Sequence, residues 1–331
     1  MKNKKINFKV LFIVLGVVVL LGGGLTFLLT KNKAPTHIDE VIVDVNKDDN
    51  LVKRKVYVLS NDNMVVPLTV SYDKKDSLAD ELYYLTSLLR VDNGVIKGSY
   101  KGVLPKDTSI LSLSIQDKIL TLGLSKEFYN YDAKNEIRII EALVWTYSQF
   151  DEIDALELKI ENELLTKMPL GKTPLPNKLT KEFGINNHIF PSDVTTNRVV
   201  TYYSKSIDGI EVFVPVSNNI EEEDISVFLE LSKSKAPLYT GLYVNEVFKS
   251  IDVVNANITE NDILLELTSS CLLEENLVSK EIYEVLQVML SSYNEDLVVS
   301  ILVEGEIVAV EGQIEEEIIK VSDVIYNEIK I

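Results

Sequence analysis

The sequence predicts an α/β (α+β) fold with two tandem β-β-α-β-β-α-β modules behind an N-terminal transmembrane helix. Short segments rich in β-branched residues alternate with segments whose apolar residues follow helical spacing. The segment 141–163 returns in altered form at 284–306, and one constant offset, here called the repeat offset, relates the two without a gap. Near the N-terminus, the segment from Val10 to Leu29 carries no charge. The 331 residues of the chain suffice for about two ordinary domains.

The N-terminal region has the charge pattern of a signal anchor. The uncharged segment 10–29 is long enough to cross a hydrocarbon core of about 30 Å. Residues 1–9 contain four lysines, which predicts a cytoplasmic N-terminus and an extracytoplasmic C-terminal body. We therefore expect a single-pass protein of the cell membrane with a polar stalk at residues 30–54. A cleaved signal peptide is the alternative interpretation of the same segment.

The composition limits the classes of partner and cofactor. The net charge is −18, and so acidic a surface repels phosphate backbones, which argues against nucleic acid as a partner. The single cysteine, Cys271, excludes an internal disulfide framework and a metal site built from several cysteines. Leu, Ile and Val are abundant, so the chain can bury a sizeable core.

The first module is expected at residues 55–166 and begins with a hairpin. Segments 55–60 and 64–72 are rich in β-branched residues and flank a turn-like Asn-Asp-Asn. Pro67 has no backbone N–H, so the second strand should lie at a sheet edge.

Further elements of this module follow from the spacing of its apolar residues. Residues 76–89 place leucines at helical spacing behind Ser77, a suitable N-cap. The segment 108–125 alternates like a hairpin around Gln116–Asp117, and the segment 141–163 supplies another helix and another strand.

The second module, at residues 198–306, is expected to repeat this order. The repeat offset pairs Leu143 with Leu286 in the last helix and Leu122 with Leu265 in the middle hairpin. Most positions of the two repeated segments differ in residue type, and what persists is the apolar face. A duplicated catalytic site would be expected to retain polar residues, so the repeat indicates a shared shape.

Two further segments adjoin the second module. The connector, residues 167–197, is rich in proline, which favours an extended and semi-rigid segment. The C-terminal segment, residues 307–331, contains apolar residues spaced like one face of a helix, namely Ile314, Ile318, Val321, Ile325 and Ile329. We expect this amphipathic helix to dock on the second module, with a partner helix as the alternative. The helix and the edge strand 64–72 are the expected contact surfaces.

Two motifs resemble ligand-binding sites but lack residues that those sites need. Gly171, Lys172 and Thr173 resemble a phosphate-binding loop, but Thr166 stands where that motif needs a glycine. The acidic run from Asp44 to Asn50 resembles the start of a calcium loop. Asp49 fills the place of its turn glycine, however, and Lys55 the place of its closing glutamate.

Isolated nucleophiles and histidines also have structural explanations. His37 and His188 lack a second ligand at metal-binding spacing. Cys271 corresponds to Phe128 under the repeat offset, so a buried thiol is expected. Ser125 lacks the glycines of a nucleophile elbow. We therefore predict no catalytic, cofactor-binding or metal-binding residues, no cofactor, and no enzyme activity.

The first module resembles the GerM domain of bacterial sporulation and germination proteins. The residues that carry the resemblance are Leu104, Pro105, Thr108, Leu124, Ser125, Ala142, Leu143, Val144 and Thr146. It extends over residues 55–306 and weakens in the second module, where Met289 takes the place of the threonine. The resemblance implies compact non-enzymatic modules, similar to ring-building motifs, that are exported and support the assembly joining mother cell and forespore. The sporulation member is a lipoprotein, whereas this chain has no cysteine placed to accept a lipid.

These observations predict a membrane-anchored extracytoplasmic scaffold or interaction protein with two GerM-like domains, in a sporulation or cell-envelope assembly. Its expected partners are proteins of the cell envelope or further copies of itself. One alternative is a small-molecule or cell-wall-binding sensor, which needs a deep pocket with convergent polar groups. A wall-glycan hydrolase is the other, and it needs two carboxylates about 5–10 Å apart in one cleft.

Overall fold

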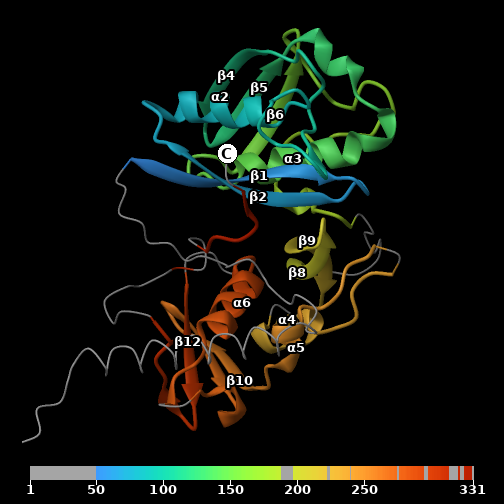
Figure 1. Ribbon diagram of the computed structural model, residues 1–331. Coiled ribbons are helices and arrows are strands. Elements are labelled where there is room, and N and C mark those ends of the chain that lie inside the picture. Colours follow the sequence, from blue (N-terminus) through green and yellow to red (C-terminus); the bar gives the residue numbers. More distant parts are fainter. Residues whose placement is uncertain are drawn as a thin grey trace, which may run out of the picture. The chain divides into compact units, whose positions relative to one another are not determined.

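The structure is a computed structural model (Figure 1), and the residues it describes fall within Glu40–Ile331. It describes residues 50–187, 197–221, 224–238, 240–273, 276–293, 297–312, 320 and 324–329. The cytoplasmic N-terminus and anchor expected at 1–9 and 10–29 lie outside these ranges, as does most of the stalk expected at 30–54. Within these ranges, no helix combines the length and apolar character needed to cross a membrane.

The first module begins with the predicted hairpin. β1 (Leu51–Ser60) pairs antiparallel with β2 (Val65–Asp73). Because β1 starts at Leu51, the end of the expected stalk, residues 51–54, belongs to this strand. The opposite edge of β1 pairs with β3 (Tyr100–Lys101), and the sheet has the order β14-β2-β1-β3.

The outer strand of this sheet comes from the C-terminal segment. β14 (Glu328–Ile329) pairs in parallel with Thr69 and Val70 of β2. The carbonyl of Pro67 accepts a hydrogen bond from Asn327 Nδ2 at 2.8 Å. The prediction that β2 lies at a sheet edge is therefore wrong, because β14 of the same chain pairs with its outer side.

The predicted C-terminal helix is wrong for residues 324–329. Burial alternates along them with the period of a strand, and Val324 and Tyr326 are almost completely buried. The edge of β2 provides backbone hydrogen-bond partners for this segment. The spacing of isoleucines within the segment gives no information about a pairing strand so distant in the sequence. Ile314 and Ile318 lie outside the described residues. The two expected contact surfaces, strand 64–72 and the C-terminal segment, therefore contact each other.

Helix α2 (Leu78–Leu88) follows β2 and begins at the predicted cap. The Ser77 hydroxyl accepts a hydrogen bond from the backbone N–H of Asp80 at 3.2 Å. Leu82 and Leu85 lie on its buried face.

A second sheet completes the first module, with the order β4-β5-β6-β7. Its predicted hairpin turns at Asp117–Lys118, one position later than expected, and both turn residues have positive φ. Helix α3 packs against both sheets, and most of its side chains are buried. The strands and helices are β4 (Ile110–Gln116), β5 (Ile119–Leu124), β6 (Ala155–Ile160), β7 (Glu163–Leu164), α3 (Glu136–Tyr147) and the 3₁₀ helices η1 (Lys126–Asn130) and η2 (Ala133–Asn135).

The second module repeats this order of main elements. Its first hairpin turns at Asp208–Gly209, both with positive φ, as a two-residue hairpin loop requires. The elements are β8 (Asn197–Ile207), β9 (Ile210–Ile220), α4 (Ile225–Ser232), α5 (Glu246–Ser250), β10 (Val253–Ile258), β11 (Asp262–Leu267), η4 (Ser269–Cys271), α6 (Lys280–Leu290), β12 (Val298–Val303) and β13 (Glu306–Ile307). Figure 1 labels most of these elements.

The repeat offset holds at the level of strand register. Leu122 pairs with Leu158 in parallel, and their equivalents Leu265 and Ile301 pair in the same way. Both β4 and β10 carry a register irregularity at equivalent places, between residues 110 and 112 and between residues 253 and 255. The repeat predicted from the sequence is therefore confirmed.

The described part of the connector, residues 167–187, packs against the folded body. Met168, Leu179 and Ile185 are buried, and Leu179 pairs with Leu156 of β6. The expectation of an extended and semi-rigid connector concerns the segment's own conformation and stays a prediction, to which the structure adds that the segment packs against the body. Proline content predicts local stiffness, but it does not indicate what the segment packs against.

Candidate functional site

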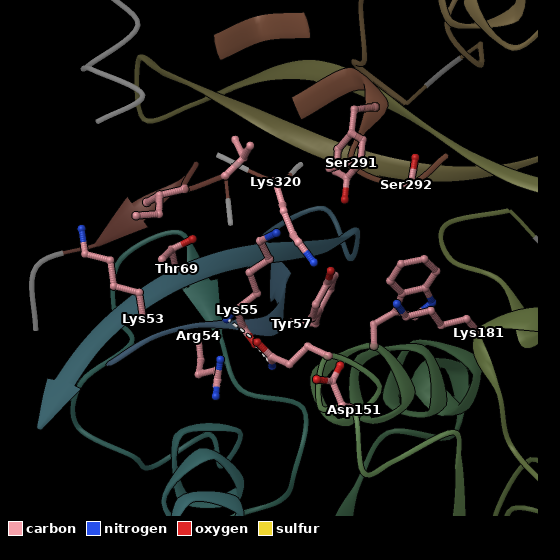
Figure 2. A pocket seen from close by; sticks show the side chains of 15 residues that line it. Lys53, Arg54, Lys55, Tyr57, Thr69, Asp151, Lys181, Ser291, Ser292 and Lys320 are labelled. Atoms are coloured by element: carbon pink, nitrogen blue, oxygen red, sulfur yellow. Dashed lines mark hydrogen bonds between the residues drawn. The ribbon is translucent and has the colours of Figure 1, made fainter. Parts of the chain in front are cut away.

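A cavity of about 560 Å³ lies beside strand β1 (Figure 2). Fifteen residues line it, and they come from both modules, the connector and the C-terminal segment. The basic residues among them are Lys53, Arg54, Lys55, Lys181 and Lys320. Asp151 is the one carboxylate among the lining residues in the described part of the chain. We call this cavity the basic pocket.

Strand β1 places its three consecutive basic residues on opposite faces of the sheet. Figure 2 shows Lys53 and Lys55 on one side of the strand and Arg54 on the other, as strand geometry requires. Arg54 Nε donates to Glu81 Oε1 at 2.9 Å. Lys53 Nζ lies 3.1 Å from Glu328 Oε1 in strand β14. The structure thus pairs two of the basic residues with carboxylates.

Two other lysines lie over aromatic rings. Lys55 Nζ is 4.6 Å from the ring centre of Tyr326, and Lys181 Nζ is 5.6 Å from that of Trp145. Lys181 belongs to the connector's 3₁₀ helix η3 (Lys181–Phe183). The hydroxyls of Tyr326 and Tyr202 are hydrogen-bonded at 2.7 Å, which fixes one ring. A cation–π contact helps to hold an ammonium group in place.

Helix α3 fixes the stretch of β1 that carries these lysines. Gln149 accepts a hydrogen bond from the N–H of Lys55 at 3.0 Å and donates to its carbonyl at 2.8 Å. Thr146 Oγ1 accepts from the N–H of Tyr57 at 3.0 Å. In the second module Ser292, the equivalent of Gln149, donates to the carbonyl of Val200. The repeats therefore share this anchoring of a strand by a polar side chain that lies two residues beyond the end of the helix.

The arrangement brings five cationic side chains and one carboxylate together among the described lining residues. Ammonium groups in a partly enclosed pocket attract negative charge more strongly than they do in bulk water. Hydrolysis of a glycosidic bond requires a pair of carboxylates, and Asp151 has no second carboxylate among the described lining residues.

The loop that resembled a phosphate-binding motif surrounds a carboxylate of the chain itself. The N–H groups of Leu170 and Gly171 donate to Glu136 Oε1 at 3.1 and 2.5 Å. The N–H and hydroxyl of Thr173 donate to Oε2 at 3.1 and 2.7 Å. Tyr131 adds its hydroxyl at 2.5 Å. The expectation that this loop is no phosphate site agrees with the geometry, because Glu136 occupies its donors.

These donors decide the charge of Glu136. Burial alone would raise the pKa of this carboxyl, but hydrogen bonds from Tyr131, Thr173 and Gly171 favour the ionised form. Their combined effect lowers the pKa of Glu136 below its ordinary value. Burial and the neighbouring Glu136 carboxylate raise the pKa of the Tyr131 hydroxyl.

The other residues that sequence reasoning considered are dispersed. Cys271 is buried, as expected from its equivalence to Phe128, and burial raises the pKa of its thiol. Ser125 Oγ accepts a hydrogen bond from the N–H of Ser109. His37, His188 and the run from Asp44 to Asp49 lie outside the described residues. Within those residues, no cluster of three metal-ligating side chains is found.

Sequence reasoning missed the basic pocket. The available signal was the run Lys53-Arg54-Lys55 in a chain where acidic residues outnumber basic ones 51 to 33. Lys181 follows the whole first module in the sequence. Only the fold shows that it lines the same pocket as Lys53, Arg54 and Lys55.

The fold and its repeat define a protein of two similar α/β modules, the first of which is similar to a known domain family. Residues 55–166 match the model of the Germane family, described as sporulation and spore germination. Over 189 residues the chain is 32% identical to the spore germination protein GerM of Bacillus subtilis (strain 168). The match covers 55% of this chain and 51% of that protein, so it spans about half the length of this curated relative.

A solved structure shares the fold of both modules. The tandem GerMN domains of the sporulation protein GerM from Bacillus subtilis superpose with a TM-score of 0.66 at 24% identity. The similarity covers 80% of this chain and 95% of that chain. The resemblance seen in the sequence is confirmed: the first module matches the Germane family model, the chain is similar in sequence to the spore germination protein GerM, and it shares the fold of the tandem GerMN domains.

Proposed function

We propose that the chain is a membrane-anchored extracytoplasmic scaffold that binds protein partners, or further copies of itself, in the cell envelope during sporulation or germination. Its relation to a spore germination protein over 189 residues supports the process. The uncharged segment 10–29, with lysines before it, supports the anchor.

One observation carries the proposal of a non-enzymatic role: the repeats keep their backbone framework while several buried polar groups change, although the buried Glu141 is retained as the buried Glu284. Strand register follows the repeat offset pair by pair. Yet Glu136, which five donors surround in the first module, becomes Ser279 in the second, and Thr146 becomes Met289. Selection on a shared shape retains the strand register and permits buried polar groups to change.

The buried carboxylates of α3 support the same interpretation, because they serve structural contacts. Glu141 Oε2 accepts from Arg138 Nη1 at 2.8 Å, and its Oε1 accepts from the N–H of Asn186 at 2.6 Å. A general acid or base has to reach a substrate, whereas this carboxylate and that of Glu136 are satisfied inside the protein.

Localisation is tested on the full chain in cells that encode it. We expect the protein in the membrane fraction, and we expect external protease to degrade its body in intact protoplasts. A matched form without residues 1–33 should stay in the cytoplasm and be protected. Recovery of the full chain as a protected cytoplasmic protein would refute the anchor.

The scaffold role is tested by chemical crosslinking of the full chain in sporulating cells. We expect discrete adducts that are missing from cells growing without sporulation, together with impaired sporulation or germination after deletion of the gene. Purified body should not release products from cell-wall glycan. Turnover of glycan, or unchanged sporulation and germination in the deletion strain, would contradict the proposal.

A further inference from the structure

We propose that copies of this chain associate head to tail by pairing strand β4 of one copy with strand β10 of the next. The inference rests on the proposed scaffold role, and it names a second copy of the chain as the partner. It draws on the edges of the two four-stranded sheets that contain β5 and β11.

Each of these sheets has one short, charged edge and one longer, uncharged edge. β7 and β13 form the first kind, with two residues each and the equivalent glutamates Glu163 and Glu306. Short strands and charged side chains are common means of preventing unwanted pairing at a sheet edge. The opposite edges, β4 and β10, contain neither charged residues nor proline, although 25% of the chain is charged. The chain thus protects one edge of each sheet and leaves the other able to pair.

The outer sides of β4 and β10 are open in the described part of the chain. There, both strands end their sheets, and each pairs only with its hairpin partner, β5 or β11. The N–H of Ala256 in β10 donates to the side-chain Oδ1 of its own neighbour Asn255 at 3.0 Å. Such a local bond satisfies a backbone donor that no strand has taken up. An added strand would supply an acceptor in its place.

Both strands expose an apolar residue at the same place. Leu111 and Val254 correspond under the repeat offset, and each lies at the register irregularity of its strand. The two residues are 48% and 63% exposed. A single exposed apolar residue needs no explanation, but its presence in both modules at an uncharged edge favours a contact surface.

The charges near the strand ends favour β4 with β10 over a strand paired with its own copy. Asp252 and Glu260 flank β10, whereas two exposed lysines, Lys106 and Lys118, flank β4, each beside an aspartate. Two copies of β10 would bring acids together, and two copies of β4 would meet with ends of mixed sign. β4 beside β10 places a lysine near an acid at both ends, whichever way the strands run. Because the two edges differ and belong to one chain, the contact repeats from copy to copy and forms an array.

The proposed anchor would strengthen this contact. Pairing of two short strands makes a small interface, which is typical of weak association in solution. An anchor confines the copies to one membrane and raises their effective concentration. The array should therefore form on the membrane at concentrations where the chain in solution is mostly monomeric.

A lysine placed in either edge should block the pairing. Ser114 and Asn257 are equivalent, exposed positions of β4 and β10. For the full chain in detergent solution, light scattering should show particles larger than dimers at about 0.1–1 mM protein. Ser114→Lys and Asn257→Lys should each raise the dissociation constant at least about tenfold. Leu164→Lys in the protected edge β7 is the matched control and should leave association unchanged.

An equimolar mixture of Ser114→Lys and Asn257→Lys tests the head-to-tail arrangement. The first variant retains an open β10 and the second an open β4, so the mixture should form dimers, whereas neither variant should do so alone. Unfolding curves that match that of the unchanged protein show that loss of association is not loss of fold. The proposal is overturned by unchanged protein that stays monomeric over this concentration range, by a mixture that stays monomeric, or by an equal effect of Leu164→Lys.

Crosslinking in sporulating cells separates this proposal from the scaffold role. Adducts between copies of the chain should disappear in both edge variants, while adducts with other proteins report the scaffold role alone. Adducts between copies that persist in both variants overturn the edge pairing and leave the scaffold role standing. Adducts with another protein that disappear in both variants, while those between copies persist, assign the edges to that protein and also overturn the pairing of copies.

Discussion

Asn186 and Asn327 follow the two modules at similar places, and each binds the second strand of both hairpins. Asn186 Oδ1 accepts from the N–H of Val65 in β2 at 2.9 Å. Its Nδ2 donates at 2.8 Å to the carbonyl of Val65 and at 2.8 Å to that of Pro215 in β9. The side chain therefore joins β2 to β9.

Asn327 makes the same set of bonds with the roles of the strands exchanged. Its Oδ1 accepts from the N–H of Phe213 at 2.8 Å, and its Nδ2 donates to the carbonyls of Phe213 and Pro67, both at 2.8 Å. Both asparagines have positive φ, 55° for Asn186 and 52° for Asn327, a conformation that asparagine tolerates better than most residues. The side chains of Asn186 and Asn327 thus join the two modules by hydrogen bonds to the backbones of β2 and β9.

Substitution of Asn186 should separate its two contributions. Asn186→Ala removes the side-chain hydrogen bonds and strains the backbone, so we expect a loss of about 2–4 kcal/mol in the free energy of unfolding. Asn186→Gly removes the bonds without the strain and should cost about 1 kcal/mol less. Urea unfolding measures both, with Asn177→Gly, an exposed connector position, as the control. Wild-type stability of Asn186→Gly would show that the hydrogen bonds contribute nothing.

Truncation after Gly312 should destabilise the protein. It removes β14 from the edge of β2, the buried ring of Tyr326 and the bonds of Asn327. We expect a lower melting temperature and, because the edge of β2 becomes open, faster aggregation on heating. Calorimetry and light scattering measure the two effects. Truncation after Ile329 is the matched control, and equal melting temperatures for the two would contradict a structural role of the segment.

The carboxylate of Glu136 should make stability depend on pH. Its pKa is lowered in the folded protein from an ordinary value of 4.5, because Tyr131 and the loop around Gly171 donate to it. This stabilisation is fully present above the ordinary pKa and is lost as the pH falls through the folded one. Glu136→Gln should cost about 2–3 kcal/mol at neutral pH and less in acid. Urea unfolding between neutral and acidic pH tests this, and a pH-independent cost would contradict it.

Gly171 lies too close to that carboxylate to carry a side chain. A Cβ at this position would stand 2.6 Å from Glu136 Oε2, which is below any normal contact. Gly171→Ala should therefore displace the carboxylate and cost about 1–3 kcal/mol. A double-mutant cycle provides the control: in a Glu136→Gln background the cost of Gly171→Ala should differ, because the two groups are in contact. Strict additivity would show that the strain lies elsewhere.

The sequence predicts those parts of the fold that depend on local periodicity or on the repeat. Leu122 and Leu265 belong to equivalent strands because alternation and the repeat offset both place them there. The strand at 328–329 escapes such reasoning because it pairs with β2 at the other end of the described chain, while the local spacing of isoleucines favours a helix.

The basic pocket could not be predicted for a related reason. Strand alternation indicates that Lys53 and Lys55 share a face, but no local pattern brings Lys181 or Lys320 to that face. The donors around Glu136 are equally hidden, since Gly171 and Thr173 belong to a loop that follows helix α3 and strands β6 and β7. Contacts between polar residues far apart in the sequence leave no periodic pattern. Because the basic pocket and the donors around Glu136 depend on such contacts, neither could be predicted.

Thr146 should contribute to stability through a single buried hydrogen bond. Its Oγ1 accepts from the N–H of Tyr57 at 3.0 Å, and the contact links α3 to β1 beside the basic pocket. Thr146→Val keeps the shape of the side chain but leaves that N–H buried without an acceptor, at a cost of about 1–3 kcal/mol. Thr166→Val, at an exposed position, is the control and should be nearly neutral. Urea unfolding gives both values, and a neutral Thr146→Val would mean that the strand is held by Gln149 and packing alone.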